Sequence, residues 1–233
     1  MAVETVRGTA MNRTAGIVCL VCALSYAATG ATFFLDPTSQ FKTGTLDYWN
    51  ALAGAPLGRQ AFLMAFALAG LTAFCAMGEV QRLIGPTSGL ARLAASLGQL
   101  GFGVTAVSYV RLLGGEAQRA QAFAAGSDAV RQSITSFSLV LDPQGWLIFF
   151  LSGLSLLLFG ALGWRFGTLP KALAVLGMAG GLLYIVAFIA RANQQMLIVD
   201  VAAGLGGVIV GPLWWAGLAL RFLRSGDQAS ARR

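Results

Sequence analysis

Arg191 and Asp200 are the residues whose types and spacing first suggest chemistry. They lie nine positions apart in ARANQQMLIVDVAAG (residues 190–204), where we expect two apolar helices joined by a tight turn. Asp200 would then lie about one helical turn inside the second helix, near Arg191 across the turn. An ion pair would neutralise both charges in apolar surroundings. The alternatives are a carboxylate that handles a proton or a cation, and an aspartate that reaches out to the membrane surface.

Gln99 and the cysteines are the other polar or reactive candidates. Gln99 lies in the middle of an apolar run, in SLGQLGFG, so its amide must either bind a neighbouring helix or line a wet cavity that holds a solute. Cys19 and Cys22 form a C-x-x-C motif inside the first apolar run, but no second pair is available to complete four metal ligands. We expect these two cysteines to be small packing residues.

Missing residue types exclude many kinds of site. The chain has no histidine, which excludes His-ligated haem, most catalytic zinc sites and a Ser-His-Asp triad. Its two lysines, Lys42 and Lys171, lie outside the apolar runs, so a retinal Schiff base within the helices is not expected. No glycine loop of a nucleotide-binding type follows a predicted strand. The sequence therefore predicts no cofactor, no metal and no catalytic residue.

Small residues four positions apart offer candidate packing surfaces. The pairs are Gly163/Gly167, Gly177/Gly181 and Gly207/Gly211. Two small residues one turn apart let another backbone approach closely, either within the chain or from a partner subunit or a second copy. Trp214 and Trp215 follow the last pair and lie about 100° apart on a helix. We expect one indole to pack inward and the other to face lipid or a partner chain.

Apolar runs dominate the chain and must position these residues. Hydrophobic residues make up 57% of the 233 residues and charged residues 11%, whereas soluble domains have about 25% charged residues. Runs long enough to cross about 30 Å of hydrocarbon as helices lie at about 15–35, 60–78, 90–113, 146–167, 171–190 and 197–221. They lack the alternation of barrel strands. We therefore predict an all-α, polytopic bundle of six transmembrane helices that forms one integral membrane domain over residues 1–233.

The first run resembles a signal peptide in two respects. Arg13 precedes it, and SYAATGA near its end is rich in small residues. The run is longer than the apolar part of a typical signal peptide. We expect it to remain as an uncleaved first helix.

The distribution of charge predicts the orientation. With six spans, both termini share a side with the loops at 79–92 and 164–171, and this side has ten basic and three acidic residues, a net charge of +7. The other side has six residues of each sign. Because Lys and Arg concentrate in short cytoplasmic segments, both termini should be cytoplasmic, in a bacterial inner membrane. The excess of basic residues then indicates contact with anionic membrane lipids, and no nucleic acid partner is expected.

Two long outer loops connect the first span to the second and the third to the fourth. In the first loop, TLDYWNAL predicts a short helix that Thr45 caps, with Trp49 on its apolar face. Apolar residues recur at helical spacing in the second loop, at Val130, Ile134, Phe137 and Leu141. We expect both helices to lie at the membrane interface or on the bundle; the alternative is a lid or a docking surface. Leu-Asp-Pro at 35–37 should end the first span, and the same tripeptide at 141–143 should cap the fourth.

Three segments carry a resemblance to a known family. They are NRTAGIVCLVCAL in the first span, the helix pair joined by Leu169-Pro170-Lys171, and GPLWWAGLALRFLR in the last span. Over nearly its whole length the chain resembles a family of uncharacterised bacterial six-span integral membrane proteins, catalogued as a domain of unknown function. The resemblance implies a six-helix membrane fold and brings no catalytic residues. The loop before the fourth span is where a departure from the family pattern is expected.

Three functions remain in competition. The leading hypothesis is a non-enzymatic subunit or scaffold of a membrane assembly, because small helix faces are abundant and cofactor motifs are absent. The second is a transporter of a small solute or an ion, which would require broken helices and polar groups near the membrane midplane. The glycine-rich stretch at 204–212 is the best candidate for such a break. The third is a lipid-modifying membrane enzyme.

Overall fold

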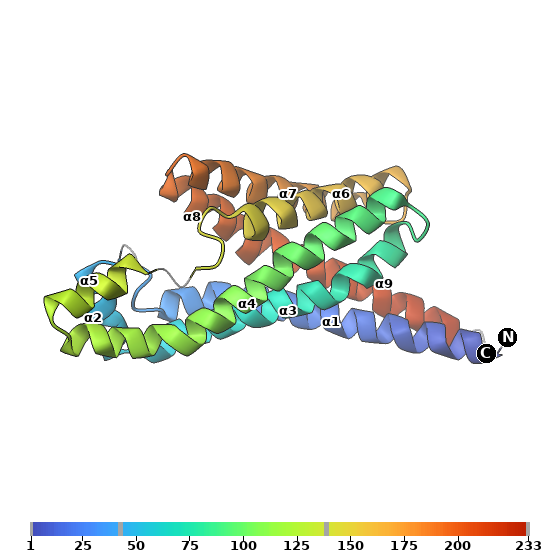
Figure 1. Ribbon diagram of the computed structural model, residues 1–233. Helices are drawn as coiled ribbons and strands as arrows, with labels where there is room; N and C mark the ends of the chain where they lie inside the picture. Colours follow the sequence, from blue (N-terminus) through green and yellow to red (C-terminus); the bar gives the residue numbers. More distant parts are fainter. Residues whose placement is uncertain (1, 42–43, 138–139, 232–233) are drawn as a thin grey trace.

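Six long apolar helices make up most of the computed structural model, which describes residues 2–41, 44–137 and 140–231 (Figure 1). The prediction of an all-α chain with six helices able to cross a membrane is confirmed. These helices are α1 (Ala2–Leu35), α3 (Pro56–Ile84), α4 (Gly89–Ala125), η1–α6 (Trp146–Leu151 and Ser152–Arg165), α7 (Lys171–Ala192) and α8–η2–α9 (Met196–Gly204, Leu205–Val210 and Gly211–Ala231). Two short helices, α2 (Leu46–Gly54) and α5 (Asp128–Ser136), lie in the long loops.

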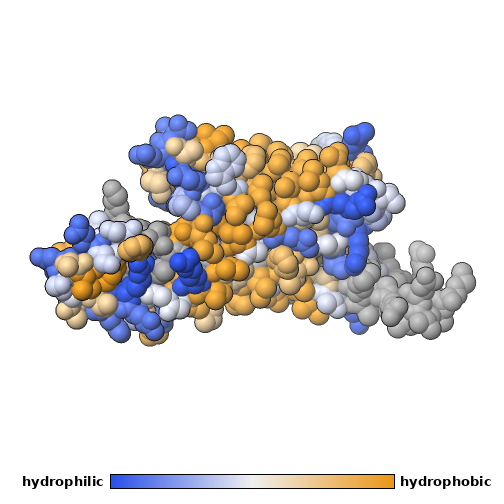
Figure 2. Space-filling view, viewed as in Figure 1, coloured by the Kyte–Doolittle hydropathy of each residue, from blue (hydrophilic) through white to orange (hydrophobic). Residues whose placement is uncertain are grey.

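The bundle has two unlike ends. Both termini lie at one end, together with the short connections at 85–88 and 166–170, and we call this the terminal end (Figure 1). At the other, which we call the loop end, lie the segments 36–41, 44–55, 126–137, 140–145 and 193–195. On the face shown in Figure 2, hydrophobic residues cover most of the surface between the two ends, and hydrophilic residues gather at both ends. This distribution is the one that a bilayer imposes on a polytopic helical protein.

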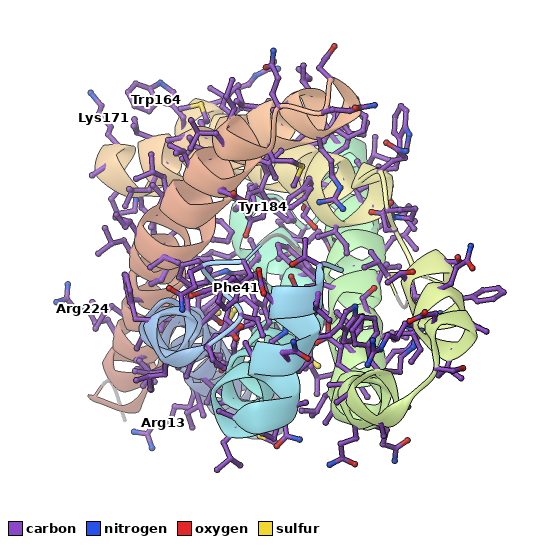
Figure 3. All side chains as sticks on the ribbon, turned by 90° about the vertical axis from the view of Figure 1, so that its left-hand side faces the viewer. Arg13, Phe41, Trp164, Lys171, Tyr184 and Arg224 are labelled. Carbon is purple, nitrogen blue, oxygen red and sulfur yellow. The ribbon has the colours of Figure 1, made fainter. Side chains whose placement is uncertain are left out.

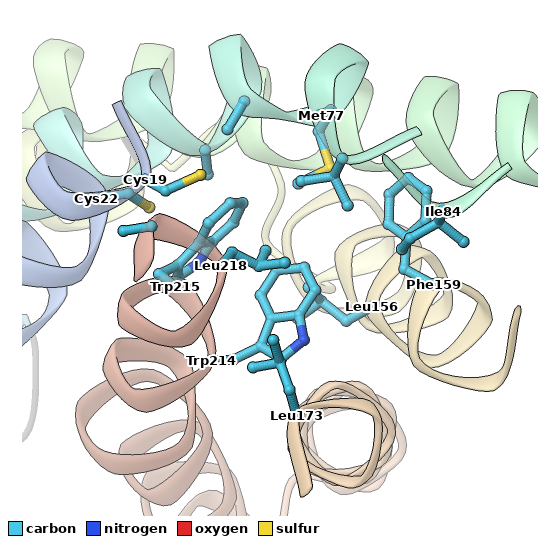
Figure 4. Close-up of a cluster of buried hydrophobic side chains, with 14 of the residues drawn as sticks. Cys19, Cys22, Met77, Ile84, Leu156, Phe159, Leu173, Trp214, Trp215 and Leu218 are labelled. Atoms are coloured by element: carbon cyan, nitrogen blue, oxygen red, sulfur yellow. The ribbon is translucent and has the colours of Figure 1, made fainter. Parts of the chain in front are cut away.

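The centre of the bundle is a buried apolar cluster around Trp214 and Trp215 (Figure 4). Trp214 is 2% exposed and Trp215 is 1% exposed, so the prediction that one indole faces outward is wrong. The reason is the position of α9, which contacts α1 on one side and α7 on another. Trp215 packs edge-on against Phe102 of α4, with ring centroids 6.2 Å apart. Both directions that the two indoles take from the helix are therefore covered by the chain itself.

The glycine pairs differ in what they do. A methyl group at Gly177 would lie 2.7 Å from the indole nitrogen of Trp214, and one at Gly181 would lie 2.5 Å from the carbonyl oxygen of Gly153. This pair therefore packs within the chain, against α9 and α6. Gly163 and Gly167 do not form a helix face, because α6 ends at Arg165 and Gly167 adopts a φ of +65° in the following turn. Glycine suits that left-handed conformation because it has no Cβ.

The helix α4 extends well beyond its apolar part. Its 37 residues correspond to about 55 Å at 1.5 Å per residue, and it continues twelve residues past the predicted end at 113. Here it supports a second core formed with α2, where Trp49 stacks on Phe123 with ring centroids 5.6 Å apart. The predicted cap of α2 is confirmed, since Thr45 Oγ1 accepts a hydrogen bond from the Tyr48 N–H at 3.3 Å.

The two Leu-Asp-Pro segments behave as predicted. The first span ends at Leu35. At the fourth span, Asp142 Oδ1 accepts hydrogen bonds from the N–H groups of Gly145 and Trp146, at 3.1 and 3.0 Å. Its Oδ2 accepts two more, from residues 147 and 148, at 2.7 and 2.8 Å. One carboxylate thus accepts from four N–H groups, and three of these, at residues 146–148, are groups that a helix start would otherwise leave unpaired.

The helix α5 ends at Ser136 and has no buried residue. Ile134 packs against the second core, whereas Val130 is 41% exposed and Phe137 is 70% exposed, so only part of the predicted apolar face of the second loop packs on the protein. Whether α2 and α5 touch a bilayer stays a prediction. Lys42, Arg232 and Arg233, which enter the charge count, lie outside the described residues.

Candidate functional site

A cavity of about 500 Å³ lies in the half of the bundle nearer the loop end. Its walls come from α1, α3, α4, η1, α7 and the α8–η2 segment, so residues from almost the whole chain meet there. Nine of its 23 lining residues are aromatic, and two, Arg191 and Asp200, are charged. Seen from the loop end, Tyr184 lies in the middle of the bundle, between the helices that enclose this space (Figure 3). The cavity is therefore mainly apolar, with two charged residues in its lining.

Contacts between aromatic rings stabilise the side of the cavity that α1, α3 and α4 form. Phe66 of α3 stacks on Tyr109 of α4, with centroids 4.3 Å apart and planes inclined by 4°. Phe62 and Tyr26 meet the ring of Phe66 edge-on, at 5.4 and 6.2 Å. Such contacts add about 0.5–1.5 kcal/mol each to the burial of the rings. They restrain α1, α3 and α4 relative to one another, so this side of the cavity is formed in advance of any ligand.

Two π-helical segments contribute to the opposite side. η1 supplies Phe149, which meets Tyr184 edge-on at 6.0 Å, and η2 supplies four lining residues. A methyl group at Gly206 of η2 would lie 3.0 Å from the Tyr184 ring, so this glycine lets the tyrosine lie directly against the η2 backbone. The interruption of the last span falls within the glycine-rich stretch that the sequence singled out. Short π-helical segments inside α-helices are frequent at functional sites.

Arg191 and Asp200 line the cavity together but do not touch. The Arg191 Nε donates a hydrogen bond to the carbonyl oxygen of Pro143 at 2.6 Å. Within the part of the chain that the structure describes, no ion pair with an N–O distance of up to 4.0 Å joins Arg191 to Asp200. The predicted contact is therefore not formed, because a loop that is distant in the sequence holds the guanidinium. A role of the two residues in handling an ion stays a prediction.

A buried ion network lies beside the cavity, toward the loop end. Arg59 of α3 donates from Nε to Glu116 Oε2 at 2.8 Å and from Nη2 to Glu116 Oε1 at 3.2 Å. Its Nη1 lies 3.2 Å from Asp36 Oδ2. The side chains of Arg59, Asp36 and Glu116 are 17%, 1% and 8% exposed. The Arg59 guanidinium carbon is 5.4 Å from the ring centroid of Phe62, which lines the cavity.

Two neutral residues complete this network. Tyr48 donates its hydroxyl to Glu116 Oε1 at 2.7 Å, and Thr38 donates its N–H and hydroxyl to Asp36 Oδ1 at 2.9 and 2.7 Å. Burial raises the pKa of Tyr48, which keeps the phenol protonated as a donor. The network joins the end of α1, the α2 segment and the first turn of α3 to α4. It therefore closes the aromatic wall at the loop end.

The sequence pointed to none of these residues as a site. Asp36 and Arg59 are 23 positions apart, and Arg59 and Glu116 are 57 positions apart, so only the fold brings them together. Glu116 lies beyond the predicted end of its helix, where the sequence shows it only as one of several loop charges. The usable signal was the equal number of acidic and basic residues at this end, which is compatible with internal pairing.

The sequence model of one family, described as "Domain of unknown function (DUF4386)", matches residues 14–220. The chain belongs to the DUF4386 family. This confirms the resemblance inferred from the sequence, and the matched region includes nearly all of the six spans. Neither the curated proteins nor the solved structures contain a match to the chain. The description of the family names no ligand, so function has to be inferred from the site.

The remaining candidates of the DUF4386 chain lie outside the cavity. Gln99 is half-buried on α4 and does not line it. Cys19 and Cys22 are fully buried in the central core, and the Cys22 thiol donates to the Ala69 carbonyl oxygen at 3.6 Å. Among the described residues, no group of three or more His, Cys, Asp or Glu side chains is placed to hold a metal ion.

Proposed function

We propose that this DUF4386 protein binds an amphiphilic, mainly apolar molecule taken from the membrane. The observation that carries the proposal is the cavity of about 500 Å³ with nine aromatic residues among the 23 that line it. Ligand pockets in proteins typically measure about 300–1,000 Å³ and combine apolar walls with a few placed polar groups. Water finds few hydrogen-bond partners at such walls. The apolar part of a lipid-like molecule, in contrast, passes from the apolar bilayer into an apolar cavity and is not transferred to water.

The wall of the cavity supports entry from the lipid. Several lining residues also face outward, among them Phe34, which is 84% exposed, Ile209, at 51%, and Met196, at 49%. The α8–η2 segment is thus a wall only one helix thick, with the bilayer on its other side. A ligand that enters between α1 and this segment would not have to cross water.

We also propose the orientation of the cavity. The net charge of +7 at the terminal end against zero at the loop end supports cytoplasmic termini in a bacterial inner membrane. The cavity then lies in the outer leaflet, with Arg191 near the outer surface. Its ligand would come from that leaflet or from the space beyond it.

Substitution of Gly204 with leucine gives a direct test. Gly204 lines the cavity in a helical conformation, and a Cβ there would meet no atom within 4 Å. Gly204→Leu should therefore fill part of the cavity without displacing backbone. The matched control is Gly78→Leu in α3, where a Cβ also meets nothing within 4 Å and which lies outside the cavity. Purification in mild detergent followed by native mass spectrometry should show a bound amphiphile on the parent and on Gly78→Leu, and much less on Gly204→Leu. Equal occupancy of all three would contradict the proposal.

Transport of the same ligand is the second candidate function. The observation that favours it is that the last span is interrupted by the π-helical segment η2 and the fourth span begins with the π-helical segment η1, and both segments line the cavity. Transporters commonly form their sites from discontinuous helices. Binding without transport requires only the cavity, so binding is the primary proposal.

The scaffold hypothesis loses part of the surface on which it relied, and a packing role of Gly207 and Gly211 stays a prediction. Trp214 and Trp215 pack inside the chain, and Gly177 contacts Trp214, so these residues are not available to a partner. Association with partner subunits or with a second copy stays a prediction, to be placed on another face. A lipid-modifying activity also stays a prediction, and it would have to use the same cavity.

A further inference from the structure

We propose that the cavity selects a dipolar head group, in which an oxyanion binds Arg191 and a primary ammonium binds Asp200. The chemical class is an amphiphile of the aminophospholipid type, with one apolar chain in the aromatic part of the cavity. This inference rests on the proposed function and adds the chemistry of the head group to it.

The two terminal nitrogens of the Arg191 guanidinium are available to a ligand in the cavity. An arginine has five N–H donors, and the hydrogen bond from Nε to Pro143 O at 2.6 Å uses one of them. Among the described residues, its terminal nitrogens donate no hydrogen bond and form no ion pair. The guanidinium is therefore oriented by the loop before η1, and its two terminal nitrogens stay available. This paired arrangement of donors matches the oxygens of a phosphate or a carboxylate.

Asp200 supplies the opposite charge from α8. Its carboxylate lines the same cavity, and the described residues offer it no hydrogen bond and no ion pair within 4.0 Å. A charged side chain within an apolar segment is costly unless it is paired or reaches water. A ligand ammonium would pair with it and, as a primary amine, would also donate hydrogen bonds to its two oxygens.

The separation of the two charges is the feature that selects a dipolar head. Because Pro143 anchors Arg191, the guanidinium cannot turn toward Asp200 without losing a hydrogen bond. A purely anionic head would satisfy Arg191 but would lie beside the negative charge of Asp200. A neutral head would leave both charges without a partner. Discrimination by an unfavourable contact of this kind is a common source of specificity.

The test compares amphiphiles that share one acyl chain and differ in the head. The probes are lysophosphatidylethanolamine, lysophosphatidylglycerol and a monoacylglycerol, each titrated into the protein in a neutral detergent and followed by native mass spectrometry. O-acylserine of the same chain length distinguishes a carboxylate from a phosphate as the bound oxyanion. We expect the ethanolamine probe to bind about tenfold more tightly than the glycerol phosphate probe, the equivalent of one well-placed ionic contact.

The variants Asp200→Asn and Arg191→Gln test which residue binds the ammonium and which binds the oxyanion of the head group. Asp200→Asn should remove the preference for the amine and leave the glycerol phosphate probe at least as tightly bound as before. Arg191→Gln should weaken the binding of both phosphate probes, and the ethanolamine probe should stay the tighter of the two because Asp200 still pairs with its amine. Asp200 is exposed, so its substitution is not expected to affect folding, and it remains informative if Arg191→Gln misfolds.

Two results would overturn different statements. If all probes bind the parent equally and Gly204→Leu weakens each of them, the cavity binds amphiphiles but does not select the head, and the inference of this subsection is wrong. If Gly204→Leu changes the binding of no probe, the proposed function itself is wrong.

Discussion

Glu116 accepts two hydrogen bonds from Arg59, at 2.8 and 3.2 Å, in a site where the two side chains are only 8% and 17% exposed. This pair joins the first turn of α3 to the extension of α4. Through Asp36, which lies 3.2 Å from Arg59, it also reaches the end of α1. Three of the helices that enclose the cavity are therefore tied together at the loop end by one guanidinium.

Removal of this guanidinium should be strongly destabilising. Arg59→Met would leave two buried carboxylates without a cation, and breaking buried pairs in this way typically costs about 3–5 kcal/mol. We expect a clear drop in the thermal unfolding midpoint in detergent. The control is Arg82→Gln, which removes the exposed partner of Glu79 and should cost less than about 1 kcal/mol. Equal unfolding midpoints for the two variants would show that the network does not stabilise the contacts between these helices.

Glu116 allows a finer test of the same network. Tyr48→Phe removes one donor to its carboxylate, and hydrogen bonds to charged groups contribute about 1.5–3 kcal/mol. Because α2 depends on this contact and on the stacking of Trp49 on Phe123, the loss should be local. Hydrogen exchange should increase over residues 46–54 and remain unchanged in α7. Uniform exchange across the chain in both proteins would argue against a local role.

The capping of η1 by Asp142 leads to a prediction about the cavity. Asp142→Ala leaves the N–H groups of residues 146–148 without their acceptor, and loss of a helix cap costs about 0.5–2 kcal/mol. Pro143, which anchors Arg191, is the next residue. We therefore expect Asp142→Ala to lower stability and also to reduce selection among head groups, whereas Asp142→Asn should retain part of both. A loss of stability with selection intact would separate the cap from the Arg191 anchor.

Local patterns in this chain predicted local structure well, and contacts across the bundle less well. Thr45 and Asp142 cap helices as expected, because a cap depends on residues within one turn. The sequence predicts that the third span ends at 113, because the following residues, GGEAQRAQ, are mostly polar or small. The helix continues because α2 covers it with Tyr48 and Trp49. That contact forms only after the chain has turned back on itself.

The site was predictable in parts. Arg191 and Asp200 were recognised as unusual, and both line the cavity. Their separation was not predicted, since the acceptor that holds Arg191 lies 48 positions away in the sequence. The aromatic lining could not be distinguished from ordinary core, because Phe and Tyr are frequent in both. A cavity forms where side chains leave space between the helices unfilled, and no sequence pattern shows where that happens.

The orientation predicted from charge can be tested with single cysteines. In a background without the three native cysteines, Ser136→Cys lies at the exposed loop end and Thr87→Cys at the exposed terminal end. A membrane-impermeant thiol reagent added to intact cells should label the first and spare the second. Inverted vesicles should give the opposite pattern. Labelling of Thr87→Cys from outside the cell would reverse the orientation and place the cavity in the inner leaflet.

Transport and simple binding differ in whether the η2 wall must move, and a reversible cross-link separates them. A Cβ at position 30 of α1 would lie 3.4 Å from the Cβ of Val208 in η2, close to the separation of about 3.5–4.5 Å found in disulfides. Replacing both residues with cysteine also removes the branched side chain that a larger residue at position 30 would meet.

In the same cysteine-free background, Gly30→Cys/Val208→Cys should therefore form a disulfide that fixes η2 to α1. If the protein transports its ligand, oxidation should stop the movement of a fluorescent aminophospholipid across proteoliposome membranes, and reduction should restore it. The control is Val208→Cys alone, which cannot cross-link within the chain and adds no side chain at position 30. Movement that continues at the same rate in the oxidised double variant would exclude transport that depends on η2. Retention of bound lipid without movement in any of the proteins would leave binding as the function of the cavity.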